Sequence, residues 1–250
     1  MGQYLRIALV LIAVAAVALI AIFLLVRPSG GLQVSVESEN LSSSAGPRFA
    51  SGEEYGYKLR FGGAAVNASV GIGGIDGEAG CLRAVRNISG LANASPLEAC
   101  YSTANGSAAY FSVLSNGEWK RMPPETYAAE PVMIFYEPWM LSLREGWSGA
   151  LNVTMKLSPG AIEVVRMEQR SANSYRFLRR ENYSGRAALV AEVVSQELEI
   201  SDGGENVTGE TRRTVWVDEE KRVVLKDTYD SNGETVEEVL VRAPFRLSLP

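Results

Sequence analysis

The sequence predicts a mainly β fold, built as an antiparallel sheet and preceded by one N-terminal transmembrane helix. Three observations predict it: an unbroken apolar stretch near the N-terminus, long runs of alternating apolar and polar residues, and Asn-Gly pairs between those runs. Alternation with a period of two places successive side chains on opposite faces of a strand. The expected parts are a transmembrane signal-anchor at 1–27, a flexible stalk rich in Ser, Gly and Glu at 28–52, and an extracellular β domain at 53–250.

The apolar stretch at 7–26 has the length of a membrane span. Its twenty residues comprise fourteen Leu, Ile, Val or Phe and six Ala, with no charge among them. At about 1.5 Å per residue, a helix of this length crosses the roughly 30 Å hydrocarbon core of a bilayer. A cleaved signal peptide is the alternative, but the stretch is longer than the usual apolar region and no small-x-small site follows it cleanly. We therefore expect a single-pass cell-membrane protein whose partners include the lipid bilayer.

Asn-x-Ser/Thr triplets are the strongest functional signal. Eight of the eleven Asn residues begin such a triplet with x not Pro, whereas roughly 1.4 are expected by chance in a count of this kind. All eight follow the apolar stretch, so the C-terminal domain is predicted to be extracellular and N-glycosylated. The eight are Asn40, Asn67, Asn87, Asn93, Asn105, Asn152, Asn182 and Asn206.

Only two cysteines are present, Cys81 and Cys100. In an extracellular domain an even number of cysteines indicates a disulfide, which we predict between these two. A metal pair or two free thiols are the alternatives. A metal site would need further ligands, and the chain has no histidine to supply them. We therefore expect no metal site and no cofactor.

The charge pattern argues against two further classes of function. Beyond the membrane stretch and its flanking Arg6 and Arg27, 29 acidic residues face 22 basic ones, without a basic stripe, so nucleic acid is not an expected partner. Without histidine, Ser-His-Asp and Cys-His catalysis are excluded. Carboxylate-only catalysis stays open, but no acidic pair is marked, and the run at 218–220 is interpreted as a solvated turn. We expect no catalytic residues and no enzyme.

The alternating runs predict the strands in chain order. Apolar residues recur at every second position across 54–61 and again across 66–72. Asn105-Gly106 and Asn116-Gly117 favour tight hairpin turns because both residue types tolerate positive φ. Further strands are expected at 108–114, 118–122, 151–157, 161–168, 174–181, 186–200, 211–217, 222–229 and 234–241.

Residues 123–147 interrupt the β pattern. Four prolines fall between 123 and 138 and exclude a long helix. A dense apolar group accompanies them, so one or two short helices or a lid-like loop are expected. The segment either completes the core as a plug, or forms the mouth of a ligand cavity or a membrane-facing surface. The candidate ligand or lid residues are Phe135, Tyr136, Trp139, Met140 and Trp147.

The C-terminal part resembles the LolA-like lipoprotein-sorting superfamily, in the version found in membrane-anchored archaeal surface proteins. A strand that ends in Trp-Val-Asp and turns into the next strand carries the resemblance, as residues 216–218 do here. The likeness is compatible with all of 54–247. The stretches that carry it are Tyr-Arg-Phe-Leu at 175–178, Tyr-Ser-Gly-Arg at 183–186, Thr-Val-Trp-Val-Asp-Glu-Glu at 214–220 and Val-Val-Leu-Lys at 223–226.

The resemblance implies a curved antiparallel sheet, or half-barrel, with short helices covering its concave face, here supplied by 123–147. It also implies a cavity for an acyl chain or for the lipid of a partner protein. This chain lacks a lipobox cysteine and carries its own membrane stretch, so it is expected to bind while tethered rather than to shuttle between membranes. The first hypothesis is thus a non-catalytic domain that binds a lipophilic ligand or a lipidated partner. The alternative is a structural or interaction component of the cell-surface layer.

Overall fold

The computed structural model describes residues 32–41, 43–61, 63–90, 95–122, 135–157, 167–201, 204–231 and 234–248. The chain divides into two compact units, one of residues 1–33 with 155–168 and one of residues 34–154 with 169–250. The predicted membrane helix at 7–26 lies outside the described residues. Within the ranges that are described, no helix is both long and apolar enough to cross a membrane. The side chains discussed below belong to the second unit.

Thirteen strands form one large sheet, so the predicted mainly β, antiparallel class is confirmed. The strand order is β1-β8-β9-β10-β11-β12-β13-β2-β3-β4-β5-β6-β7, and the pairings from β9 to β7 in that order are antiparallel. The strands are β1 (Leu32–Glu39), β2 (Glu54–Phe61), β3 (Ala64–Asp76), β4 (Cys81–Ser89), β5 (Leu97–Ser102), β6 (Ala108–Ser115), β7 (Glu118–Met122), β8 (Ser148–Leu157), β9 (Met167–Tyr183), β10 (Arg186–Ser201), β11 (Gly204–Asp218), β12 (Val224–Ser231) and β13 (Glu234–Arg242).

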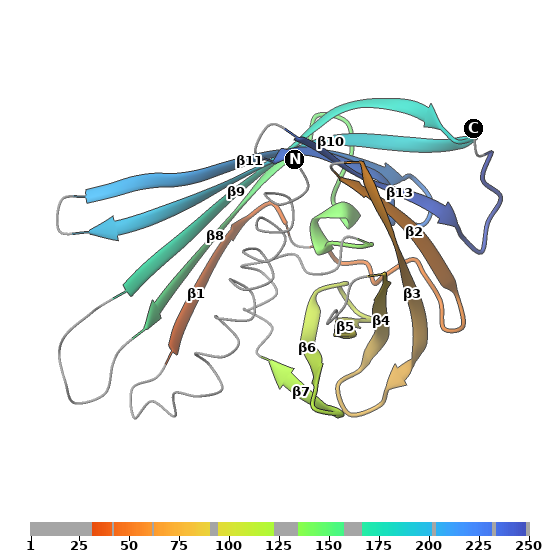
Figure 1. Cartoon of the computed structure of the whole chain (residues 1–250), viewed down its shortest axis with the longest axis horizontal. Helices are drawn as coiled ribbons and strands as arrows, with labels where there is room; N and C mark the ends of the chain where they lie inside the picture. The colour runs from red at the N-terminus through yellow and green to blue at the C-terminus, as the bar shows by residue number, and fades with distance from the viewer. Residues whose placement is uncertain are drawn as a thin grey trace. The chain divides into compact units, whose positions relative to one another are not determined.

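The sheet is strongly curved, and the strands β3 to β6 bend around a short helical turn (Figure 1). This turn is the 3-10 helix η1 (Pro138–Leu141), the only helix within the described ranges. Pro138 opens it, consistent with the preference of proline for the first turn of a helix. Within 123–147, where one or two short helices or a lid-like loop were expected, the described residues contain one four-residue turn, and residues 123–134 lie outside the described part.

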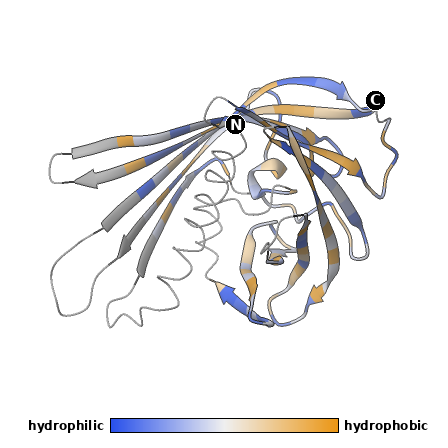
Figure 2. Ribbon diagram, in the orientation of Figure 1, coloured by the Kyte–Doolittle hydropathy of each residue, from blue (hydrophilic) through white to orange (hydrophobic). Residues whose placement is uncertain are grey.

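Most predicted strands within the described residues are present, but β4 and β5 were not predicted, and most of the strand expected at 161–168 lies outside the described residues. Along β3 the residues alternate between the two faces, and Figure 2 shows hydrophobic and hydrophilic residues interspersed along the strands rather than gathered in long runs. Asn116 and Gly117 connect β6 to β7 with φ values of 54° and 81°. Two consecutive positive φ angles are typical of the type I′ turn, whose twist matches that of the flanking strands.

The buried face of the sheet continues across strands that are far apart in sequence. Strand β2 pairs with β3 on one side and with the C-terminal strand β13 on the other, where Tyr57 lies opposite Leu240. Tyr57 also donates a hydrogen bond of 3.0 Å from its hydroxyl to the carbonyl oxygen of Val224 on β12. The core therefore forms around pairings between the first and last thirds of the chain.

Part of the segment predicted as a stalk packs against this unit. Residues 32–39 form strand β1 at one end of the strand order. Phe49 is buried, with its ring centroid 4.9 Å from that of Phe135. Arg48 donates hydrogen bonds to the backbone carbonyls of Glu219 and Glu220.

The turn between β11 and β12 corrects one interpretation drawn from the sequence. The run at 218–220 does form a turn, but the solvated interpretation is wrong for Asp218, which is fully buried. Asp218 accepts hydrogen bonds of 2.7 and 3.0 Å from Arg186 and two more from the backbone N–H groups of Glu220 and Lys221. A carboxylate with these partners stabilises a tight turn without contact with water.

Candidate functional site

Residues 135–147, called here the cover segment, lie against the inner face of the sheet. All five candidate ligand or lid residues belong to it and are buried. They fall into two aromatic groups. Phe135 and Tyr136 pack with rings from the sheet, including Tyr101 at a centroid distance of 4.7 Å from Tyr136. Trp139 stacks on Trp147 at 6.1 Å, and its ring also contacts Tyr175 of β9 at 5.1 Å.

Hydrogen bonds hold the cover segment to the sheet through its backbone. The N–H of Val224 donates to the carbonyl oxygen of Phe135 over 2.9 Å. Arg222 donates from Nη1 to the carbonyl oxygens of Met140 and Leu143, at 3.2 and 2.8 Å. Because the segment has only one turn of helix, its own backbone supplies few N–H donors for its carbonyl groups. The bonds from Val224 and Arg222 satisfy some of these carbonyls.

A buried ion pair also joins the cover segment to the sheet. Arg213 of β11 donates from Nε and Nη2 to Asp227 Oδ2, at 3.0 and 2.7 Å, and from Nη2 to Glu137 Oε1 at 3.1 Å. Glu137 Oε2 in turn accepts the indole N–H of Trp139 at 2.7 Å. Burial alone would lower the pKa of Arg213, but Glu137 and Asp227 raise it, so the guanidinium stays charged. The position of Trp139 therefore depends on this network.

The same face carries a further buried acid and a buried base. Glu238 of β13 lies directly opposite Asp227 of β12, and Arg86 of β4 is buried as well. Burial raises the pKa of Glu238 to about 7; Arg86 acts in the opposite direction, and the charge of Asp227 adds to the rise. A carboxyl group with this pKa is present in both the neutral and the charged form near pH 7.

Two oxygen atoms of this group are buried without a partner. Glu238 Oε2 and Asp227 Oδ1 have no hydrogen-bond partner within the part of the chain that the structure describes. More than nine in ten buried polar groups in native proteins are hydrogen-bonded, so two such oxygens on one pair of strands are unusual. They make this part of the inner face a candidate for contact with a hydrogen-bond donor.

Sequence analysis did not single out these charged residues, although a signal was present. Asp227 lies two positions after Leu225, and Glu238 two positions before Leu240, so both fall on the apolar phase of an alternating strand. Arg213 precedes Val215 in the same way. A charge at an apolar position of a period-two pattern indicates a buried charge, which must be paired or neutralised.

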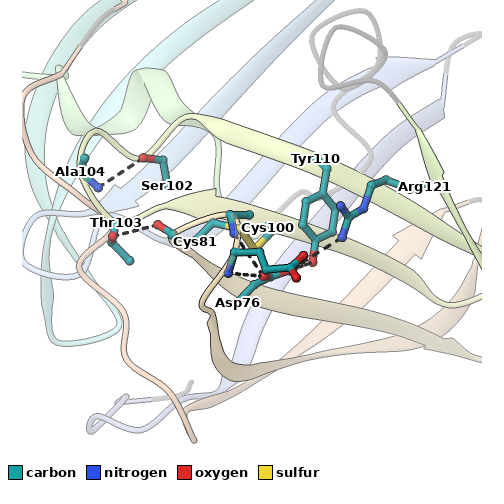
Figure 3. The surroundings of a disulfide bond; sticks show 11 residues. Asp76, Cys81, Cys100, Ser102, Thr103, Ala104, Tyr110 and Arg121 are labelled. Atoms are coloured by element: carbon teal, nitrogen blue, oxygen red, sulfur yellow. Dashed lines mark hydrogen bonds and ion pairs between the residues drawn. A yellow bond between two sulfur atoms is a disulfide. The ribbon is translucent and has the colours of Figure 1, made fainter.

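The predicted disulfide between Cys81 and Cys100 is confirmed, with an S–S distance of 2.04 Å. It joins neighbouring strands β4 and β5, and both cysteines are fully buried. Figure 3 shows Tyr110 beside it, with its hydroxyl donating to Asp76 at 3.0 Å and the guanidinium of Arg121 lying over its ring. The disulfide belongs to the packing of the sheet and is remote from the cover segment in sequence.

Six of the eight predicted glycosylation sites have described side chains, and all six are exposed. They are Asn40, Asn67, Asn87, Asn105, Asn152 and Asn182. Asn67 lies between buried Val66 and Ala68, and Asn87 between Arg86 and Ile88, so both point away from the inner face. The side chains of the other two, Asn93 and Asn206, lie outside what the structure describes. Glycosylation itself stays a prediction.

Comparisons with known proteins gave no family. No protein-family model matches the chain. No curated protein matches it either.

Several solved structures align with most of the chain at low sequence identity. An exported protein with a YmcC-like fold from Bacteroides fragilis is 10% identical over 81% of this chain and 100% of its own, with a TM-score of 0.35. The hypothetical lipoprotein YmcC from Escherichia coli is 13% identical over 77% and 85%, with a TM-score of 0.32. An outer membrane lipoprotein-sorting protein domain from Vibrio parahaemolyticus is 10% identical over 79% and 86%, with a TM-score of 0.32.

Proposed function

We propose that this chain is a membrane-tethered, N-glycosylated extracellular protein that binds a lipophilic ligand, or the lipid of a lipidated partner, at the concave face of its sheet. The observation that carries this proposal is the way in which the inner face is covered. A sheet must bury its apolar face against another layer. Within the described residues that layer is the cover segment, which is aromatic and has one four-residue helical turn.

A cover of this kind suits an exchangeable ligand. A regular helix or second sheet satisfies its own backbone, so displacing it breaks many cooperative bonds. The cover segment instead packs through its side chains, and its backbone and Glu137 are held by hydrogen bonds from Val224, Arg222 and Arg213. Segments with little regular structure open at a lower free energy than the strands of a core. An acyl chain could then pack against Trp139, Trp147 and Tyr175, which offer large apolar surfaces.

The four tryptophans of the chain allow a direct test. Trp139 and Trp147 lie in the cover segment, Trp119 is 45% exposed on the edge strand β7, and Trp216 lies on the outer face of β11. A monoacylglycerol with a brominated acyl chain quenches tryptophan fluorescence only at short range. We expect saturable quenching of the purified full-length protein, reduced by Trp139→Phe and Trp147→Phe.

Trp119→Phe and Trp216→Phe are the matched controls and should leave the quenched fraction of the fluorescence unchanged or raise it. Lipid extraction after purification adds an independent measurement, since a bound acyl compound should copurify at a constant molar ratio. If only Trp119→Phe or Trp216→Phe reduced the quenching, the acyl chain would lie at the surface, and the proposal would be contradicted.

A role as a structural or interaction component of the cell-surface layer is the second candidate. The exposure of six sequon asparagines favours it, because a dense glycan coat suits a protein that mainly shields or spaces a surface. Chemical crosslinking on intact cells separates the two roles. A structural component should crosslink repeatedly to the same neighbours and yield no acyl compound on extraction.

A further inference from the structure

We propose that Asp227 and Glu238 form a polar subsite on the concave face that accepts hydrogen bonds from the head of the bound molecule, and that this head carries hydroxyl or ammonium donors rather than an anionic group. This inference rests on the proposed function and names the class of its ligand. It stands on three features of the inner face: register, unpartnered oxygens and charge balance.

Register places the two carboxyl groups together. Asp227 and Glu238 are direct partners across β12 and β13, so both side chains project to the same face. That face is the inner one, because Leu225 and Leu240, each two residues away, belong to the hydrophobic core. Asp227 is 2% exposed and Glu238 is 4% exposed.

In each carboxyl group one oxygen atom has no hydrogen-bond partner among the described residues. Asp227 uses Oδ2 for both hydrogen bonds from Arg213, which leaves Oδ1 without one, and Glu238 Oε2 is in the same state. In their charged form both carboxylates only accept hydrogen bonds, so in that form the missing partner must be a donor. Two acceptors on adjacent strands match a head group with two or more donors, as in a glycerol, a sugar or an amine.

The surrounding charges favour the same kind of head. The charged groups that face Glu238 are Arg86 from β4, Arg213 from β11 and Asp227 from β12, and Glu137 of the cover segment joins them through Arg213. The tyrosines that face this group are Tyr57 of β2 and Tyr229 of β12. Among the described residues, two bases thus face three acids, and Asp227 and Glu137 both pair with Arg213. A phosphate or carboxylate head would meet unpaired acidic oxygens, which costs binding free energy.

The protonation of Glu238 supports a pH-dependent preference. Burial raises its pKa to about 7, so its charged fraction grows between pH 6 and pH 8. The charged form of Glu238 attracts an ammonium head more strongly than the neutral form of Glu238 does. A hydroxyl head is satisfied by either form, because a neutral carboxyl group still accepts hydrogen bonds.

The experiment compares three probes with the same acyl chain on the full-length protein. They are a monoacylglycerol, an alkylamine and a fatty acid, each titrated at pH 6 and pH 8 by competition against the brominated monoacylglycerol. We expect the monoacylglycerol and the amine to bind at least about tenfold more tightly than the fatty acid. We also expect amine binding to tighten from pH 6 to pH 8.

Glu238→Gln is the informative variant and Glu237→Gln its matched control. Gln keeps the size of Glu but adds a donor and removes the charge, so the preference for the amine should fall about tenfold and lose its pH dependence. Glu237 is the neighbouring residue on the opposite face, where it pairs with Arg60 and Lys226, and its variant should behave as the wild type. A melting curve for each variant separates a binding defect from unfolding.

The possible outcomes are distinct. If no acyl probe binds, the proposed function fails and the subsite fails with it. If acyl probes bind but the fatty acid equals or exceeds the others, only the subsite is overturned. The subsite is overturned as well if a folded Glu238→Gln protein keeps the wild-type order and pH dependence.

Discussion

Asp227 and Glu238 face each other directly across strands β12 and β13, and both carboxyl groups are buried on the core side of the sheet. Like charges in directly opposite positions destabilise a strand pair. Arg213 neutralises Asp227 through two hydrogen bonds, whereas Glu238 Oε2 is buried without a hydrogen-bond partner among the described residues. The pair therefore stays compatible with the fold because Glu238 can take up a proton.

This relationship predicts that stability falls as pH rises. Burial raises the pKa of folded Glu238 from 4.5 to about 7, so between these values the folded state holds a proton that the unfolded state has released. The contribution of Glu238 is fully present below pH 4.5 and is lost as pH rises through 7. The loss amounts to about 3 kcal/mol. Denaturant unfolding from pH 4.5 to 8 measures it.

Glu238→Gln is the control for that measurement, since an amide does not titrate in this range. The difference in unfolding free energy between the two proteins isolates the titration of this one group. We expect the unfolding free energy of the variant to rise relative to that of the wild type as pH rises from 4.5 to 8. A difference that stays constant over this range would contradict the assignment.

The Arg213 network predicts a large cost for removing its base. Arg213→Met leaves Glu137 and Asp227 buried without their cation, and breaking a buried pair on one side costs about 3–5 kcal/mol. Arg60→Met is the matched comparison, because Arg60 is 58% exposed in its pair with Glu237. Such surface pairs contribute about 0–1 kcal/mol. Equal melting temperatures for the two variants would show that the buried network does not stabilise the fold.

The close approach of the cover segment to Gly106 predicts that a larger residue at this position destabilises the fold. A Cβ atom at this position would lie 2.4 Å from both Leu141 Cδ1 and Tyr136 Oη, and the backbone has a φ of 72°. Gly106→Ala should therefore lose about 2–4 kcal/mol by combining overpacking with backbone strain. Gly117 has a φ of 81°, but a Cβ atom there would have nothing within 4 Å. Gly117→Ala should therefore lower the free energy of unfolding by only about 1 kcal/mol. Thermal unfolding of both variants checks the difference.

The exposed asparagines predict glycans on the outer face of the sheet. Ser69 completes the triplet of Asn67, so Ser69→Ala should remove one glycan and increase the electrophoretic mobility of the protein. Ser69→Thr keeps the triplet and should keep the wild-type mobility. Treatment with an amidase that removes N-glycans should bring all three proteins to the same mobility. Identical mobility of wild type and Ser69→Ala before treatment would show that Asn67 is unoccupied.

Local sequence predicted those parts of the structure that local interactions determine. The period-two runs predicted most of the strands, though not β4 or β5, and the Asn116-Gly117 pair predicted a hairpin with positive φ angles. The disulfide followed from there being two cysteines in a domain predicted to be extracellular. In each case the determining residues lie next to one another or are the only ones of their kind, so no knowledge of the sheet order was needed.

Local sequence could not predict the order of the strands in the sheet or the partners of the buried charges. No local signal indicates that β2 pairs with β13, because the two strands are far apart in the sequence. The apolar phase of their strands marks Asp227 and Glu238 as inward-facing, but the pattern does not show that they lie opposite each other. The partners of Glu137 also depend on where the cover segment packs, which its own residues do not determine.

The pairing of β2 with β13 has a consequence for biogenesis. Strand β2 is made early, yet one of its edges stays unpaired until almost the whole chain has emerged from the ribosome. Topologies dominated by such distant pairings fold slowly, and an unpaired edge is a template for aggregation. Nascent chains that end before residue 234 should therefore depend on chaperones, and truncation of the last strand should be more damaging than its nine residues suggest.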